Sequence, residues 1–282
     1  MIELRGPEVS KKIKEQVQAT LSAYDGPVPK LAIVRVGEKP DDLSYERGAK
    51  KKLESFGLAV ESYAYPEEIG DDEFYRAFCK INDDPKVTGI LLLMPLPSQI
   101  RTERIREQID PEKDVDGISP VNMAKVFAGD PKGFAPCTAE AVVQILKQNG
   151  IELTGQRVTV VGRSLVVGRP LSMLLLKENA TVTVCHTRTR ELEKVCREAD
   201  ILVACAGQKR MITKAYVKKQ AVVVDVGIHA EENGTLCGDV AYEDILDTAS
   251  MATPVPGGVG SVTTAVLAGH LMQAALRQNK TR

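Results

Sequence analysis

Residues 157–170, RVTVVGRSLVVGRP, hold the pattern that decides the fold. A β-branched run ends at Gly162, a short loop follows, and Pro170 stands where a helix is expected to begin. Such a loop turns free backbone amides and the positive end of a helix dipole toward an anion. The usual G-x-G-x-x-G spacing is absent, because only Gly162 and Gly168 remain. Taken alone, the stretch fits either a nucleotide-binding loop or an ordinary glycine-containing turn.

Downstream of this loop the chain keeps alternating short strands with helical segments. Strands are expected at residues 180–186, 199–207 and 221–227, with helical segments between at least the first three of the four runs. This rhythm is typical of a Rossmann-type parallel sheet, whose strands are buried on both faces.

The first part of the chain shows a similar alternation. Strands are predicted at residues 31–37, 58–65 and 89–97, and helices at 71–84 and, opened by Pro40, at 41–56. A further helix at 138–150, capped by Thr138 and ended by Gly150, is expected to join two domains.

These patterns predict an α/β protein of two domains with a cleft between them. Residues 1–118 are expected to form an N-terminal α/β domain, and residues 119–261 a Rossmann-type domain with a parallel sheet. The last helix, within residues 262–282, is amphipathic and is expected to pack back on the first domain.

Composition argues against several classes of protein. The chain has 37 basic and 38 acidic side chains, so its charge does not favour nucleic acid or an anionic membrane as a partner. No apolar run approaches the roughly 20 residues that span a bilayer, and no signal segment is recognised, so a cytoplasmic location is expected. The six cysteines lack metal-ligand spacing and there are only three histidines, so no metal site is expected.

The tip of the strand at 180–186 bears on the cofactor. NAD sites usually place a carboxylate there for the ribose hydroxyls, whereas this chain has Thr187, Arg188, Thr189 and Arg190. Guanidinium groups form charge-assisted, bidentate bonds with phosphate oxygens. The pattern therefore favours NADP over NAD, with Arg163 as a second positive charge. Ordinary surface arginines are the alternative, and NAD is not excluded.

Three motifs carry a resemblance to a known family. VVGRSLVVGRP, TPVPGGVGSVT at residues 253–263 and PEKDVDG at residues 111–117 are similar to the bifunctional methylenetetrahydrofolate dehydrogenase/cyclohydrolase family, over essentially the whole chain. The resemblance implies a folate site in the first domain and the cleft, and an NAD(P) site in the second. It also implies a homodimer formed through the nucleotide domain and 5,10-methylenetetrahydrofolate as the substrate, in one-carbon metabolism.

The resemblance gives roles to single residues. Asp116 would hold the pterin ring, Tyr45 would stack along the aromatic middle of the folate, and Pro256, Gly257 and Gly258 would shape the wall beside both ligands. Together with the phosphate argument, it places along the cofactor Gly162, Arg163, Ser164, Gly168, Thr187, Arg188, Gly207 and Ile228.

The residue types alone also fit plainer roles at these positions. An aspartate in a K-D-V-D-G turn is often turn chemistry, and a helical tyrosine is often packing. A Pro-Gly-Gly sequence is often only a tight turn. Asp225 and Asp239 end strands and fit either caps or site residues.

Ser261 stands where the family usually has proline, and two further departures bear on cyclohydrolase chemistry. The lysine central to cyclohydrolase chemistry would stand four residues after Tyr45, where this chain has Ala49, and its glutamine partner is replaced by Leu93. Lys50 points to another side of the helix, because each residue turns it by about 100°, and Lys52 lies about 5 Å farther along the axis than Ala49. We therefore predict a dehydrogenase whose cyclohydrolase activity is weak or absent.

Three alternatives remain at this point. The first is a fully bifunctional enzyme in which Lys50 or Lys52 replaces the missing lysine. The second is a protein that binds NADP or folate without catalysis. The third is another two-domain NAD(P)-dependent dehydrogenase, such as one acting on amino acids.

Overall fold

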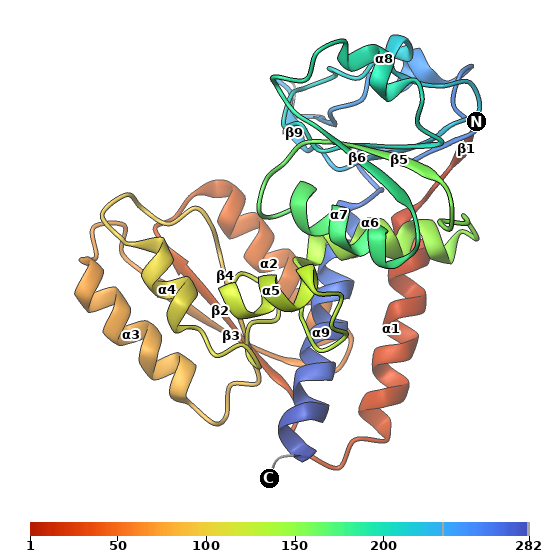
Figure 1. Cartoon of the computed structure of the whole chain (residues 1–282). Helices are drawn as coiled ribbons and strands as arrows, with labels where there is room; N and C mark the ends of the chain where they lie inside the picture. Colours follow the sequence, from red (N-terminus) through yellow and green to blue (C-terminus); the bar gives the residue numbers. More distant parts are fainter. Residues whose placement is uncertain (233, 281–282) are drawn as a thin grey trace. The chain divides into compact units, whose positions relative to one another are not determined.

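The computed structural model describes residues 1–232 and 234–280, and the chain divides into two compact units (Figure 1). The six-stranded unit consists of Met1–Lys11 with Thr138–Thr263, and the three-stranded unit consists of Lys12–Cys137 with the chain from Thr264 onward. Helices α1 (Gly6–Ser22) and α9 (Gly260–Lys280) each begin in residues of the first unit and continue into the second.

The six-stranded unit contains a wholly parallel sheet. Its order is β1 (Ile2–Glu3), β11 (Met251–Ala252), β8 (Val222–Asp225), β7 (Ile201–Ala204), β5 (Arg157–Val161) and β6 (Thr181–Cys185). The four strands from β5 to β8 lie in the expected β-rich runs, and the Rossmann-type parallel sheet is confirmed. Strands β1 and β11 have two residues each, too few to form a period in the sequence.

Helices and a small hairpin complete this unit. They are α6 (Cys137–Gln148), α7 (Gly168–Lys177), α8 (Leu192–Cys196), the 3-10 helices η1 (Lys214–Tyr216) and η2 (Tyr242–Ile245), and the antiparallel pair β9 (His229–Ala230) and β10 (Leu236–Cys237). The prediction that Thr138 caps α6 was wrong, because the helix already begins at Cys137. The carboxylate of Asp116 accepts the Cys137 amide instead, at 2.9 Å.

The three-stranded unit is a parallel sheet in the order β3 (Ala59–Tyr65), β2 (Lys30–Val36), β4 (Gly89–Leu92). Helices α3 (Asp71–Asp83) and α4 (Thr102–Gln108) cover one face, where Phe74 and Phe78 pack on Val34 and Leu92 (Figure 1). Helices α2 (Pro40–Ser55) and α9 cover the other face (Figure 1). A short helix, α5 (Pro120–Phe127), follows the turn after β4 and α4.

Strand β4 is shorter than the expected run of residues 89–97. The Leu93 amide still donates to the Val34 carbonyl at 2.9 Å, but Pro95 and Pro97 have no amide hydrogen with which to continue the ladder. The chain between Leu93 and the start of α4 is therefore a loop that has left the sheet.

The two units divide the chain differently from the boundary expected at residues 118 and 119. Residues 119–137 lie in the three-stranded unit, where Asn122 of α5 donates to Asp114 at 2.9 Å. The first residues lie in the six-stranded unit because β1 pairs with β11. The chain from Thr264 onward, which includes most of the last helix, belongs to the three-stranded unit.

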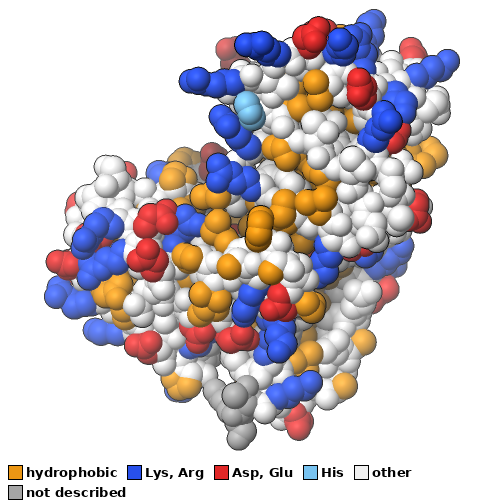
Figure 2. Space-filling view, viewed as in Figure 1, with side chains coloured by type: hydrophobic (Ala, Val, Ile, Leu, Met, Phe, Trp, Pro, Cys, Tyr) orange, Lys and Arg blue, Asp and Glu red, His pale blue; other side chains and the backbone are white. Residues whose placement is uncertain are grey.

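The described surface carries both signs of charge. On the face shown in Figure 2, Lys and Arg side chains are interspersed with Asp and Glu. Within the described ranges, no helix combines the length and the apolar composition needed to cross a bilayer.

Candidate active site

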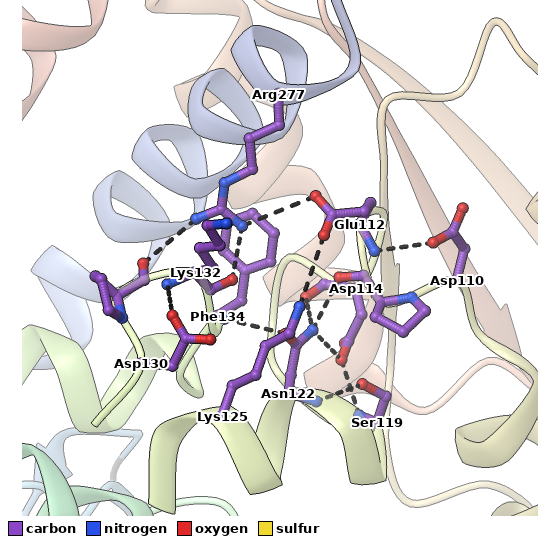
Figure 3. A network of polar contacts seen from close by, with 12 residues as sticks. Asp110, Glu112, Asp114, Ser119, Asn122, Lys125, Asp130, Lys132, Phe134 and Arg277 are labelled. Carbon is purple, nitrogen blue, oxygen red and sulfur yellow. Dashed lines mark hydrogen bonds and ion pairs between the residues drawn. The ribbon is translucent and has the colours of Figure 1, made fainter. Parts of the chain in front are cut away.

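The turn that carries Asp116 is held by buried hydrogen bonds (Figure 3). The Asp114 carboxylate accepts the amide of Ser119, at 2.8 Å, and the side-chain amide of Asn122. It also accepts the amide of Ile118 at 2.9 Å. Gly117 follows with φ +63°, and a side chain there would overlap the Phe134 carbonyl. Only glycine fits both conditions, so the backbone on either side of Asp116 is fixed.

Asp116 itself is half-buried and faces the start of α6. Its Oδ1 accepts the Cys137 amide at 2.9 Å. Burial raises the pKa of this carboxyl group, and the hydrogen bonds from Cys137 oppose that rise. The neighbouring Val115 carbonyl is held by His270 of α9, whose Nδ1 lies 2.8 Å from it. The carboxylate thus occupies a supported position.

Tyr45 extends from α2 toward the same residues. Burial raises the pKa of its hydroxyl, and the charges of Asp116 and Cys137 act in the same direction. A side-chain hydrogen bond with Thr264 of α9 has the opposite effect. The hydroxyl end is therefore enclosed, while the residue as a whole keeps 37% of its surface exposed. The structure brings Tyr45 and Asp116 together, although they are distant in the sequence.

The two departures that bear on cyclohydrolase chemistry are apolar and buried. Ala49 is 1% exposed on α2, and Leu93 is 8% exposed just beyond β4. Lys50 is exposed, whereas Lys52 is partly buried and burial lowers its pKa. Neither Ala49 nor Leu93 has a side-chain group that donates, accepts or carries a proton.

A separate cavity of about 370 Å³ lies in the six-stranded unit at the carboxyl ends of β5, β6 and β7. Gly162, with φ +139°, is the first residue after β5, and a side chain there would overlap Cys205. Gly168 begins α7, and a side chain there would overlap the Gly162 carbonyl. The two glycines allow the loop to fold closely against the strands, at the position where open α/β sheets bind ligands.

Several of the expected cofactor residues line this cavity. Gly162, Arg163, Ser164 and Thr187 are among its walls. Arg188 and Ile228 are exposed outside the lining, and Gly207 lies between the lining residues Ala206 and Gln208. Thr189, named with the polar residues at the tip of β6, also lines the cavity, whereas the sequence interpretation did not single out His186, Cys205 or Gln208.

Two buried aspartates organise the loops after β7 and β8. The Asp239 carboxylate accepts the amides of Ala206 and Gly207, at 2.6 and 2.9 Å, and lies 2.7 Å from the His229 ring. Asp225 accepts the amides of Gly227, Asp239 and Val240. Burial raises the pKa of Asp225 to about 6, while these hydrogen bonds oppose the rise. Asp239 therefore braces the loop that carries Gly207, and Asp225 holds the backbone of Asp239 in place.

The Pro-Gly-Gly turn belongs to the six-stranded unit. Gly257 has φ +102°, and its carbonyl accepts the Gly6 amide at 2.9 Å. A side chain on Gly258 would meet the Pro254 carbonyl at 2.5 Å. The turn itself therefore requires both glycines, Gly257 for its backbone conformation and Gly258 because no space remains for a side chain.

Two family models cover most of the chain. The tetrahydrofolate dehydrogenase/cyclohydrolase catalytic domain matches residues 4–116, and the NAD(P)-binding domain of the same family matches residues 136–279. The chain belongs to the tetrahydrofolate dehydrogenase/cyclohydrolase family. The sequence resemblance and the two-domain α/β fold are thereby confirmed.

Relatives of this family align with nearly the whole length of the chain. The bifunctional protein FolD of Clostridioides difficile is 50% identical over 98% of this chain and 97% of its own. The crystal structure of the bifunctional FolD enzyme of Campylobacter jejuni has a TM-score of 0.95 at 36% identity, covering 98% of this chain and 99% of that one. The Trypanosoma brucei dehydrogenase-cyclohydrolase, solved with NADP and an inhibitor, has a TM-score of 0.93 at 31% identity and covers 99% of both chains.

Proposed function

We propose that this family member oxidises 5,10-methylenetetrahydrofolate to 5,10-methenyltetrahydrofolate with NADP, and that it has little or no cyclohydrolase activity. The observation that carries the proposal is a contrast within the three-stranded unit. Tyr45 and Asp116, the residues assigned to folate binding, lie together, whereas the positions assigned to proton transfer are Ala49 and Leu93.

The six-stranded unit fits the cofactor. The glycine-lined loop before α7 provides backbone room for a pyrophosphate, and Arg163 and Ser164 lie in the same wall. Neither Arg163 nor Arg188 forms an ion pair with another described residue, so both guanidinium groups are available to a 2′-phosphate. When bound, NADP supplies a nicotinamide ring that accepts a hydride.

The dehydrogenase step depends on orientation. Asp116 is placed to accept hydrogen bonds from the polar edge of a pterin, and Tyr45 offers an aromatic face to the middle of the folate. A hydride leaves the one-carbon bridge and the folate nitrogens stabilise the resulting cation, so no side chain has to remove a proton from carbon. Well-oriented reactants alone can lower a barrier by about 7–11 kcal/mol. The chain therefore keeps what this step needs.

Hydrolysis of the methenyl product is more demanding. Water adds, protons shift and a carbon–nitrogen bond breaks, and a group of suitable pKa is worth roughly 10²- to 10⁴-fold in rate. Ala49 and Leu93 supply no such group. We infer that a separate enzyme completes this step.

A direct assay tests the proposal. Purified protein is mixed with 5,10-methylenetetrahydrofolate and NADP, and NADPH formation is followed separately from hydrolysis of added methenyltetrahydrofolate. The proposal requires NADPH formation with hydrolysis close to the buffer rate. Binding of NADP without NADPH formation would instead identify a non-catalytic binding protein.

The arginines give a prediction about cofactor choice. Replacing Arg163 and Arg188 by alanine is expected to raise the KM for NADP by roughly 10- to 100-fold, because each forms a charge-assisted bond with the 2′-phosphate. The KM for NAD should stay nearly constant. Steady-state kinetics with both cofactors check this, with the exposed Arg197→Ala in the same unit as the matched control. Equal losses with NAD and NADP would contradict the phosphate role.

The homodimer implied by the family resemblance also remains a proposal. Strand β6 forms one end of the six-stranded sheet, and Thr181, Thr183 and Val184 on it are exposed. An exposed strand edge readily pairs with another copy, and a charge placed there prevents pairing. Light scattering should give a dimer mass for the wild type and a monomer mass for Val184→Lys. Val28→Lys, at an exposed site of the other unit, is the control, and a monomeric wild type would contradict the proposal.

A further inference from the structure

An ion pair joins the centre of the three-stranded sheet to the helix that carries Tyr45. Arg35, near the end of β2, donates from Nε to the Glu46 carboxylate of α2 at 2.7 Å, and from Nη1 to the Gly37 carbonyl at 2.5 Å. The two side chains are only 13% and 12% exposed. In every other ion pair found among the described residues, at least one of the two side chains is more exposed than both Arg35 and Glu46.

The sheet register places this pair beside the apolar positions of the site. Val34 pairs with Leu92, and the Leu93 amide bonds to the Val34 carbonyl, so Leu93 runs alongside Arg35. Val34 and Leu92 belong to the core under α3. Because side chains alternate along a strand, Arg35 and Leu93 point to the opposite face, which α2 covers.

The helical spacing places the other half of the pair on the same side. Glu46 precedes Ala49 by three residues and Leu53 by seven, so all three share the face of α2 that meets the sheet. Ala49 and Leu53 are buried. Tyr45, one residue before Glu46, therefore points about 100° away from the carboxylate around the helix axis.

We propose that the Arg35–Glu46 pair is a positioning pair for the dehydrogenase reaction. It fixes the rotation of α2 on β2 and so directs Tyr45 at the folate. Apolar contacts such as those of Ala49 and Leu53 tolerate small rotations. A planar guanidinium group that is anchored to the Gly37 carbonyl of its own segment and bonded to the Glu46 carboxylate of α2 does not. This inference rests on the proposed contact between Tyr45 and folate.

The test is a kinetic double-mutant cycle between Glu46→Gln and Tyr45→Ala. Each single change is expected to raise the KM for 5,10-methylenetetrahydrofolate, by about tenfold for Glu46→Gln, because small misplacements of a binding group have large kinetic effects. In the Tyr45→Ala background, adding Glu46→Gln should have little further effect. The dissociation constant for NADP, bound by the other unit, should not change.

Further variants separate positioning from folding. Arg35→Lys keeps the charge but loses the planar fork, so it should fall between wild type and Glu46→Gln in KM. Arg35→Met combined with Glu46→Met leaves no unpaired buried charge and should fold, yet keep a raised KM. Glu61→Gln breaks the more exposed Lys30–Glu61 pair of the same sheet and should leave the KM unchanged.

The outcomes distinguish this inference from the proposed function. If Tyr45→Ala raises the KM but Glu46→Gln does not, or if the two effects are fully additive, the positioning role is overturned and the function stands. If the Met/Met variant recovers a wild-type KM, the pair acts only as packing and the inference is overturned. If Tyr45→Ala leaves the KM unchanged, both the inference and the assignment of Tyr45 are overturned.

Discussion

The variant carrying Ala49→Lys and Leu93→Gln is expected to hydrolyse 5,10-methenyltetrahydrofolate at least about 10²-fold faster than the wild type, because it regains a proton carrier. Position 49 is 1% exposed, so burial would lower the pKa of a lysine there toward neutrality. The new glutamine would provide that lysine with a hydrogen-bond partner. Oxidation of methylenetetrahydrofolate should change little. Stopped assays of each half-reaction measure both rates.

Single changes and the native lysines provide the controls. Ala49→Lys alone should gain less, since its buried ammonium group lacks a partner and an unsatisfied group costs about 1–3 kcal/mol. Wild-type hydrolysis is expected to be close to the buffer rate, and Lys50→Met and Lys52→Met should leave it unchanged. Wild-type hydrolysis clearly above the buffer rate, abolished by Lys52→Met, would show instead that Lys52 replaces the family lysine.

Asp116→Ala is expected to lower kcat/KM for methylenetetrahydrofolate by roughly 10- to 100-fold, the value of a charge-assisted hydrogen bond. It also leaves the Cys137 amide without its acceptor, so the free energy of unfolding should fall by about 1–3 kcal/mol. Asp116→Asn keeps an acceptor for that amide and should recover stability but not full activity. Kinetics and urea unfolding separate the two effects, and Asp72→Asn, an exposed aspartate of the same unit, is the control.

The pH dependence gives an independent check on Asp116. Its pKa is raised by burial, so folding favours the protonated form. The stability from this group is therefore present at low pH and is lost as the pH rises through the folded-state pKa. Substrate binding has the opposite dependence, because the carboxylate is the form that accepts bonds from the pterin. The KM for folate should rise on the acid side in the wild type but not in Asp116→Asn; the same acid limb in both would exclude Asp116 as its source.

Most of the fold could be predicted from the sequence because its elements have strong local patterns. Strands β5, β7 and β8 are apolar runs bounded by glycine or polar residues, and α2 begins at Pro40 as expected. The two-residue strands β1 and β11 gave no signal, because their pairing joins opposite ends of the chain. The predicted start of α6 was wrong because the acceptor for its first amide is the carboxylate of Asp116, which lies 21 residues earlier in the sequence.

Part of the candidate site could also be predicted from local sequence patterns. Motifs singled out Asp116, Tyr45 and the glycines as candidates, because each lies in a short stretch that can be recognised from a few adjacent residues. The supporting groups follow no short spacing: Asp239 reaches Gly207 across the unit, and Arg35 meets Glu46 from another element. A charged residue in a buried strand, Arg35 within LAIVRVG, was the signal that a partner was needed.

Helices α1 and α9 pass from one unit into the other, so neither unit is a continuous piece of chain. During translation the strands of the three-stranded sheet emerge long before α9, which covers one of its faces. That face stays without its cover until the six-stranded unit has also been synthesised. The three-stranded unit is therefore completed only after α9 has been synthesised, and truncation before Thr264 would leave the earlier sheet open to aggregation.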